Sequence, residues 1–312
     1  MDPMNPLPPK QSTGRYRLAW GAAVALAVGA SVVLGRCAST SSPVPPTLST
    51  QTPPARLVVL DPGMLEVLIH LEATESIVGR PDYTDDWNEV SGLPTMGTGL
   101  TPNYEQIVRA HPDLILTQGS RGSVMTNLQK IASTRNLPWL TVTEVAEGIR
   151  STGALLGIGS SAEHLASSLE TGLADTTSAD SPRVLVLLGA PTQGAPELWY
   201  VKPHSIHGAA LAAAGGLNAI TKVLQGPPTI SIEALLQIDP EIILILVSDV
   251  STTDEQISEY RKFWEQFPML QANHENKIGF MIGTTHFSTG PGVLDFKTAL
   301  AQELNTLKDS TP

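Results

Sequence analysis

The sequence is poor in cysteine and in positive charge, and each shortage excludes a class of function. Cys37 is the only cysteine among 312 residues, so the folded region has no internal disulfide, cysteine-ligated zinc site or Cys-x-x-Cys redox pair. The chain contains 19 Lys and Arg against 30 Asp and Glu. Residues 56–312 carry 15 of the basic and 29 of the acidic residues, a net charge of −14. A surface of this sign repels phosphate backbones and anionic lipid headgroups, which argues against nucleic-acid binding.

Sequence motifs of catalysis are also missing. The chain has no Gly-x-Ser-x-Gly elbow, no Walker loop and no His-Glu-x-x-His motif. Residues 157–162 (GIGSSA) have glycine spacing similar to a dinucleotide fingerprint, but they lie in a stretch of helical periodicity that no strand precedes. We therefore expect a protein that is not an enzyme and that carries no cofactor.

A membrane-length apolar run lies near the N-terminus. Residues 18–35 (LAWGAAVALAVGASVVLG) are uncharged and mostly apolar. As a helix they would span about 27 Å, close to the thickness of a bilayer core. Lys10, Arg15 and Arg17 precede the run, which predicts a cytoplasmic N-terminus and export of the chain that follows.

The residues directly after this run leave the mode of membrane attachment open. Residues 34–37 (LGRC) resemble a lipobox, except that Arg36 stands where a small residue is expected before Cys37. Lipidation of Cys37, an uncleaved anchor and simple cleavage nearby are three alternatives. Each of them places residues 56–312 outside the cytoplasm, in the periplasm or on the outer face of the cytoplasmic membrane.

A Ser/Thr/Pro-rich linker separates the run from the body of the protein. Residues 39–54 (STSSPVPPTLSTQTPP) contain 13 Ser, Thr or Pro among 16 positions and no charge, a composition that cannot bury a core. We expect a disordered spacer that holds the body near a membrane. The predicted organisation is a cytoplasmic N-terminus (1–17), a transmembrane anchor or signal segment (18–35), the linker (36–55), an N-terminal α/β lobe (56–147), a connecting helix (148–174) and a C-terminal α/β lobe (175–312).

The body contains an internal repeat that predicts its architecture. Residues 103–117 (NYEQIVRAHPDLILT) and 231–245 (SIEALLQIDPEIILI) align without gaps at an offset of 128 residues. In each, a capping residue opens a short amphipathic helix, a proline blocks its continuation and an acid leads into a β-rich run.

Further strand-like runs alternate with helical patterns. They are residues 56–60 and 139–142 in the first half and residues 183–188 and 277–282 in the second. This alternation indicates two Rossmann-like α/β lobes with parallel sheets. Residues 148–174 between them have helical apolar spacing without proline, and they predict one continuous connecting helix of about 40 Å.

The order of several segments resembles a known family. These segments are residues 56–80 (RLVVLDPGMLEVLIHLEATESIVGR), the Tyr83 loop, residues 97–117, residues 215–218 (GGLN) and residues 230–246. Together they are similar to the substrate-binding proteins of ABC importers for vitamin B12, ferric siderophores and haem, the class III periplasmic binding proteins. The resemblance covers residues 56–312 almost completely, and it implies a ligand cleft between two lobes joined by a helix.

The resemblance also implies docking on the permease subunits of an importer through one acid on each lobe. Glu66 matches the first acid. The corresponding place in the second lobe, around Ala212, has no acid, so either Glu197 or Glu233 takes that role or the protein does not dock in the usual way.

Aromatic, histidine and arginine side chains in the loops are the candidate ligand contacts. Large aromatics offer flat apolar walls to a macrocycle or an aryl siderophore, and we expect Trp87 and Trp199 in the cleft but Tyr200 packed in the strand. His204, His207 and His286 are weaker candidates for metal coordination, against the alternative that they are solvated or line the cleft. Arg121 opens a helix, where it would meet an anionic group or be solvated. The predicted ligand-binding residues are Tyr83, Trp87, Arg121, Trp199, His204, His286 and Phe287.

These observations predict an extracytoplasmic, membrane-tethered binding protein. The expected ligand is a metal chelate (corrinoid, haem or ferric siderophore) that the protein passes to an ABC importer. Because the loops lack a cluster of Arg and Lys, a highly charged ferric catecholate fits least well. The alternative is a membrane-anchored ligand-binding or sensor module that is not coupled to a permease.

Overall fold

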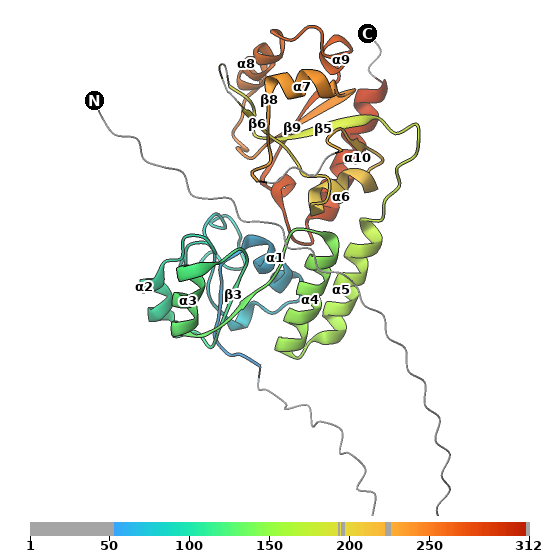
Figure 1. Cartoon of the computed structure of the whole chain (residues 1–312). Coiled ribbons are helices and arrows are strands. Elements are labelled where there is room, and N and C mark those ends of the chain that lie inside the picture. Colours follow the sequence, from blue (N-terminus) through green and yellow to red (C-terminus); the bar gives the residue numbers. More distant parts are fainter. Residues whose placement is uncertain (1–52, 193, 195–196, 222–225, 310–312) are drawn as a thin grey trace, which may run out of the picture. The chain divides into compact units, whose positions relative to one another are not determined.

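The structure, a computed structural model, describes residues 53–192, 194, 197–221 and 226–309, which belong to one compact unit. Figure 1 shows its elements along the chain. The apolar run at 18–35, Cys37 and nearly all of the linker lie outside the described residues. Within the described ranges, no helix combines the length and the apolar character needed to cross a membrane.

The N-terminal lobe contains a parallel sheet with strand order β2-β1-β3-β4. All three residues of β1 and all four of β3 are buried, as expected for the central strands of a parallel sheet covered on both faces. The elements of this lobe are β1 (Leu57–Val59), α1 (Pro62–His70), the 3-10 helix η1 (Thr74–Ser76), β2 (Ile77–Gly79), α2 (Tyr104–Ala110), β3 (Leu114–Thr117), α3 (Gly122–Ile131) and β4 (Ser133–Asn136).

The C-terminal lobe contains a second parallel sheet with strand order β10-β9-β5-β7. A separate antiparallel pair, β6 with β8, accompanies it. The elements are β5 (Arg183–Leu188), β6 (Glu197–Trp199), α6 (Ile206–Ala213), β7 (Leu217–Asn218), β8 (Thr229–Ser231), α7 (Ile232–Ile238), β9 (Ile242–Val247), α8 (Asp254–Trp264), α9 (Gln271–His274), β10 (Ile278–Ile282), η2 (Thr284–Phe287) and α10 (Val293–Asp309). Two parallel sheets with intervening helices confirm the predicted α/β class.

The internal repeat is visible as two equivalent helix–strand units, α2–β3 and α7–β9. Asn103 and Ser231 cap the two helices, with side-chain oxygens that accept hydrogen bonds from the backbone N–H of Gln106 and Ala234. Both helices end in a residue with left-handed backbone conformation, followed directly by the proline. The same local signals therefore produce the same unit twice.

One predicted strand is absent, and one strand of the N-terminal sheet was missed. Residues 139–142 do not form a strand: Thr141 caps the following helix in a capping box with Glu144. The fourth strand of the sheet is instead β4, whose polar sequence STRN has no alternating apolar pattern. Its backbone pairs with β3 at the edge of the sheet, where side chains need not be apolar.

The continuous helix predicted for residues 148–174 is broken. Helix α4 (Val142–Leu156) ends at Gly157, which has a φ of 74°, and α5 (Gly159–Gly172) begins after Ile158. A glycine with positive φ is a common helix stop because other residues are strained in that conformation. Helix α5 alone leads from one lobe to the other: Ala162, near its start, packs on α4, and Gly172 at its end lies against Leu294 of α10.

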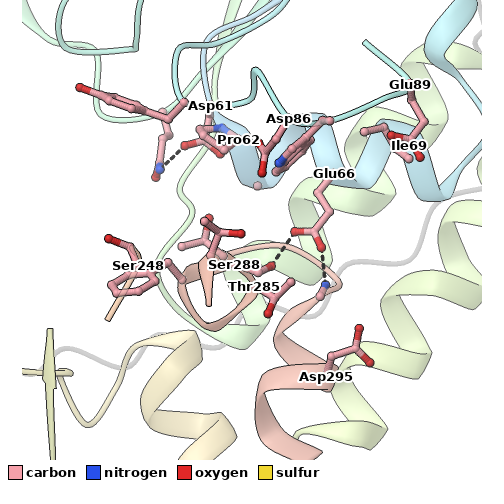
Figure 2. Close-up of a pocket in the computed structure, with 18 residues that line it drawn as sticks. Asp61, Pro62, Glu66, Ile69, Asp86, Glu89, Ser248, Thr285, Ser288 and Asp295 are labelled. Carbon is pink, nitrogen blue, oxygen red and sulfur yellow. Dashed lines mark hydrogen bonds between the residues drawn. The ribbon is translucent and has the colours of Figure 1, made fainter. Parts of the chain in front are cut away.

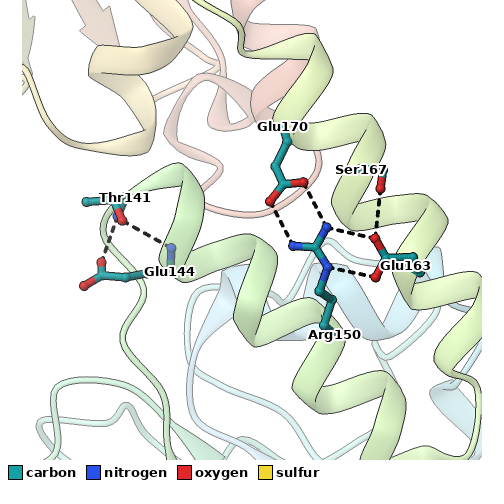
Figure 3. Close-up of polar contacts among 6 residues, drawn as sticks. All are labelled: Thr141, Glu144, Arg150, Glu163, Ser167 and Glu170. Carbon is teal, nitrogen blue, oxygen red and sulfur yellow. Dashed lines mark hydrogen bonds and ion pairs between the residues drawn. The ribbon is translucent and has the colours of Figure 1, made fainter.

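The two connector helices pack closely as a hairpin. The guanidinium of Arg150 on α4 binds two carboxylates of α5, with Nε 2.9 Å from Glu163 Oε2 and Nη1 2.8 Å from Glu170 Oε1 (Figure 3). A Cβ placed on Gly153 would lie 2.1 Å from the Cβ of Ala162, so the helix backbones approach as far as a glycine permits.

We expect Gly153→Ala to destabilise the protein although alanine favours helices. The added methyl group forces the hairpin apart, at a cost of roughly 1–3 kcal/mol, which exceeds the helix-propensity gain of roughly 0.5–1 kcal/mol. Gly159→Ala is the matched control, because a Cβ there meets no atom within 4 Å. Urea unfolding should show the first variant less stable and the second equal to or more stable than the parent; equal stability of the two would contradict the close contact.

Buried apolar side chains connect the lobes through the hairpin. One cluster includes Leu57 and Leu65 of the N-terminal lobe, Ile149 of α4, and Leu211 and Phe296 of the C-terminal lobe. Two smaller clusters lie within single lobes. A core shared in this way restricts the motion of one lobe against the other.

Candidate functional site

A pocket of about 650 Å³ lies where strands of both lobes end. Asp61 follows β1, Gln118 follows β3, Ser248 follows β9, and Thr284 follows β10. In open parallel α/β sheets, ligands bind at the carboxyl ends of the strands, where loops present side chains on a rigid framework. The pocket therefore has the expected position of a ligand site, and Figure 2 shows the side chains that line it.

Three aromatic side chains contribute to the pocket wall: Tyr83, Trp87 and Phe287. Trp87 and Phe287 are half-buried and pack against the core shared by the lobes. Tyr83 is 83% exposed and has a φ of 66°, a left-handed conformation that is uncommon for a bulky residue. The pocket thus combines two fixed aromatic rings with one that projects into solvent.

Asp61 is held in place by two hydrogen bonds. Asp61 caps α1, because its Oδ1 accepts a hydrogen bond from the backbone N–H of Met64. Its Oδ2 accepts a hydrogen bond from Gln118 Nε2 at 2.5 Å. Desolvation by burial nevertheless raises the pKa of Asp61 above its usual range, against the opposite effect of these bonds. Asp61 therefore holds the Gln118 side chain in place and has no oxygen without a partner.

Glu66 of α1 links the N-terminal lobe to the C-terminal lobe. Its Oε2 accepts from Ser288 Oγ at 2.5 Å, and its Oε1 accepts from the backbone N–H of Gly292 at 2.7 Å (Figure 2). Burial raises the pKa of Glu66, because desolvation outweighs the two hydrogen bonds. A Cβ on Gly292 would lie 2.2 Å from the carboxylate, so only glycine permits this contact.

Two further hydrogen bonds join the lobes. Trp139 Nε1 donates to the carbonyl of Thr289 at 3.0 Å, and the backbone N–H of Ile206 donates to the carbonyl of Leu140 at 2.7 Å. The loop after β10 thus contacts the N-terminal lobe through Ser288 and Thr289 together.

Comparison with known sequence families shows to which family the chain belongs. A sequence profile described as "Periplasmic binding protein" matches residues 57–274, which include the N-terminal lobe, the hairpin and most of the C-terminal lobe. The match contains the pocket-forming loops after β1, β3 and β9. The chain belongs to this family. No curated protein sequence matches it.

Solved structures of other periplasmic binding proteins have the same fold. The vitamin B12 binding protein BtuF of Vibrio cholerae is 19% identical, with 83% of this chain and 100% of that chain covered at a TM-score of 0.64. A periplasmic haem-binding protein from Pseudomonas aeruginosa is 20% identical, covering 80% and 91% at 0.65. An ABC-type Fe³⁺-hydroxamate transport protein from Saccharomonospora viridis is 19% identical, covering 81% and 93% at 0.62. At these identities the likeness establishes the fold, and the resemblance predicted from the sequence is confirmed.

The sequence-predicted ligand residues of this periplasmic binding protein divide into two groups. Tyr83, Trp87 and Phe287 line the pocket. The other four do not line it. Arg121 is exposed as the N-cap residue of α3, Trp199 is 52% exposed on β6, His204 is exposed before α6, and His286 lies in η2.

Two of the three histidines proposed for metal coordination pack against an aromatic ring. His207 and His286 have ring centroids 5.4 and 5.8 Å from that of Phe296. Burial lowers the pKa of His207 to about 4 and also lowers that of His286, so both rings are neutral near pH 7. In the described part of the chain, no three His, Cys, Asp or Glu side chains are grouped as metal ligands require. The packing of His207 and His286 on Phe296 therefore gives no support to the predicted metal coordination.

The place of Glu66 does not suit the predicted permease contact. Docking requires a carboxylate on an outer surface, whereas both oxygens of Glu66 accept hydrogen bonds from the other lobe.

Tyr200, which the sequence predicted to pack in the strand, is 1% exposed.

The polar residues of the pocket were missed by the sequence reasoning. They are Asp61, Asp86, Glu89, Gln118, Ser248, Thr284, Thr285, Ser288, Thr289 and Asp295. Their position along the chain could have indicated half of them. Five of the ten lie within three residues of the carboxyl end of a strand in one of the parallel sheets.

Proposed function

We propose that this periplasmic binding protein captures a metal-chelate ligand outside the cytoplasm and delivers it to an ABC importer. The ligand is a corrinoid, a haem or a ferric siderophore, and the N-terminal segment or a lipid on Cys37 tethers the protein to the membrane. The observation that carries this proposal is the aromatic-lined pocket of about 650 Å³ at the strand ends of both lobes. Its size lies in the range of small-molecule sites, and flat apolar walls suit chelates of this kind.

The conformation of Tyr83 supports a role in binding. A bulky residue with positive φ costs of order 1 kcal/mol, and such strain persists where the surroundings impose it, often at ligand sites. Because the Tyr83 side chain is mostly exposed, packing within the protein does not compensate the strain. A ligand that covers the ring provides that compensation.

We expect the full chain in detergent to bind one chelate saturably at micromolar or lower concentration. Titration calorimetry with cyanocobalamin, haemin and a ferric hydroxamate measures this directly. Tyr83→Asn should weaken the binding about tenfold, since an aromatic contact is lost, without loss of stability, because asparagine tolerates positive φ.

Met269→Asn is the matched control. Met269 is 67% exposed and does not line the pocket, so its replacement removes similar apolar surface without touching the ligand. Unchanged affinity in Tyr83→Asn would remove that residue from the site. Failure of every chelate to bind would overturn the proposed function.

The second candidate is a tethered ligand-binding or sensor module that is not coupled to a permease. The engagement of Glu66 between the lobes, with Ala212 at the other expected docking place, favours it. Co-purification of the tethered protein from its native membrane separates the two proposals. Recovery of permease subunits with the protein supports import, whereas recovery of the ligand-loaded protein alone supports the uncoupled module.

A further inference from the structure

The charged side chains that line the pocket in the described part of the chain are all acidic. Five carboxylates contribute to it, and no Lys, Arg or His is among the described residues that line it. Four of these acids come from the N-terminal lobe and one from the first turn of α10. Figure 2 labels all five: Asp61, Glu66, Asp86, Glu89 and Asp295.

Two of the five are occupied by the protein itself, and three are not. Asp61 and Glu66 accept hydrogen bonds with both oxygens. Asp86, Glu89 and Asp295 are exposed, and none of them makes a side-chain hydrogen bond or ion pair within the described ranges. These three carboxylates are therefore free to meet a ligand, and they approach it from both lobes.

The neighbouring acid Asp85, which does not line the pocket, is paired with a cation. Asp85 lies in the same loop but forms an ion pair with Arg80, whose Nη2 is 2.6 Å from Oδ1. Arg80 is almost fully buried, and its other nitrogens bond Leu93 and Thr84, so it cannot turn toward the pocket. This cation is thus fixed away from the site.

We propose that the ligand of this site is a metal chelate with a net positive charge. The proposal rests on the proposed function and defines its substrate class. Tyr83, Trp87 and Phe287 cover the apolar face of the chelate and attract cations through their ring faces. Asp86, Glu89 and Asp295 pair with the positive group, and a cleft lined by one sign of charge concentrates ligands of the opposite sign. Haem, which bears carboxylates, and anionic ferric catecholates are repelled by the acidic side chains of the pocket and are therefore disfavoured as ligands.

The test compares chelates that differ in charge but hardly in shape. Ferrioxamine B carries a free ammonium group, and its N-acetyl derivative is neutral with the same iron hydroxamate. Aquocobalamin is cationic, and cyanocobalamin is the neutral corrinoid. The full chain in detergent is titrated with both pairs by calorimetry. In whichever pair the protein binds, the cationic chelate should bind about tenfold more tightly than the neutral one, and added salt should reduce this preference.

The double variant Asp86→Asn/Glu89→Gln should reduce the preference for the cationic chelate to about threefold or less. Both residues are exposed, so folding is preserved. Asp180→Asn/Glu255→Gln changes net charge equally at exposed positions that do not line the pocket, and it should keep the full preference.

Three outcomes are separable. A preference for the cation that the first double variant removes and the second retains supports the proposal. Equal or tighter binding of the neutral chelate, of haemin or of a ferric catecholate overturns the charge assignment but leaves the chelate-binding function standing. Absence of binding by chelates of every charge overturns the proposed function and this inference with it.

Discussion

Replacing Trp139 by alanine should cost about 3–5 kcal/mol of unfolding free energy, a large loss for a single substitution. Trp139 is 5% exposed and lies between three parts of the protein. A Cβ on Gly63 of α1 would lie 2.7 Å from its Nε1, and one on Gly148 of α4 would lie 2.3 Å from its Cζ3. Its Nε1 also donates to the carbonyl of Thr289 in the other lobe. Truncation therefore leaves a cavity at the junction and an acceptor without its donor.

Thermal unfolding measures this effect as a fall in Tm of roughly 6–20 °C. Trp139→Phe keeps an aromatic ring but removes the donor and part of the ring volume, so an intermediate loss is expected. Trp199→Ala is the control: this ring is 52% exposed, and its removal should cost about 1 kcal/mol or less. Similar losses in Trp139→Ala and Trp199→Ala would show that Trp139 does not join the lobes.

The fold could be predicted where local signals decide the structure. Caps at Asn103 and Ser231, the prolines after them and the apolar runs of β3 and β9 act within a few residues, and these elements form as expected. The helical connector was predicted without its break, because Gly157 is tolerated within a helical pattern and its positive φ is not visible in the sequence. Strand β4 was missed because an edge strand is specified by its neighbour's backbone and needs no apolar pattern of its own.

The candidate site was predictable only for its aromatic residues. Tyr83, Trp87 and Phe287 are large side chains in loops after strands, a position that is informative on its own. The pairing of Glu66 with Ser288 and Gly292 spans more than 220 residues of chain, and nothing local indicates it. Nothing local indicates the packing of His207 and His286 on Phe296 either. In the sequence these two histidines resemble metal ligands, whereas in the structure they pack against an aromatic ring.

The second large effect concerns Glu66, whose replacement by alanine should cost about 1–3 kcal/mol. The loss arises because the N–H of Gly292 and the hydroxyl of Ser288 lose their acceptor at a partly buried place. Glu66→Gln should behave differently. The amide oxygen still accepts from Gly292, its nitrogen can donate to Ser288 Oγ, and the variant buries no charge. At pH 7 the glutamine variant is therefore expected to be as stable as the parent or more stable.

The pH dependence of this difference has a definite sign. Because burial raises the folded-state pKa of Glu66 above its ordinary 4.5, the folded protein binds more protons than the unfolded chain between 4.5 and the raised value. Stability contributed by this group falls as pH rises through that window. The free-energy difference between Glu66→Gln and the parent should thus increase from pH 4.5 upward and then level off, as measured by urea unfolding at each pH. Parallel curves for the two proteins would show that the carboxylate is solvated, and that the contact between the lobes does not depend on its protonation.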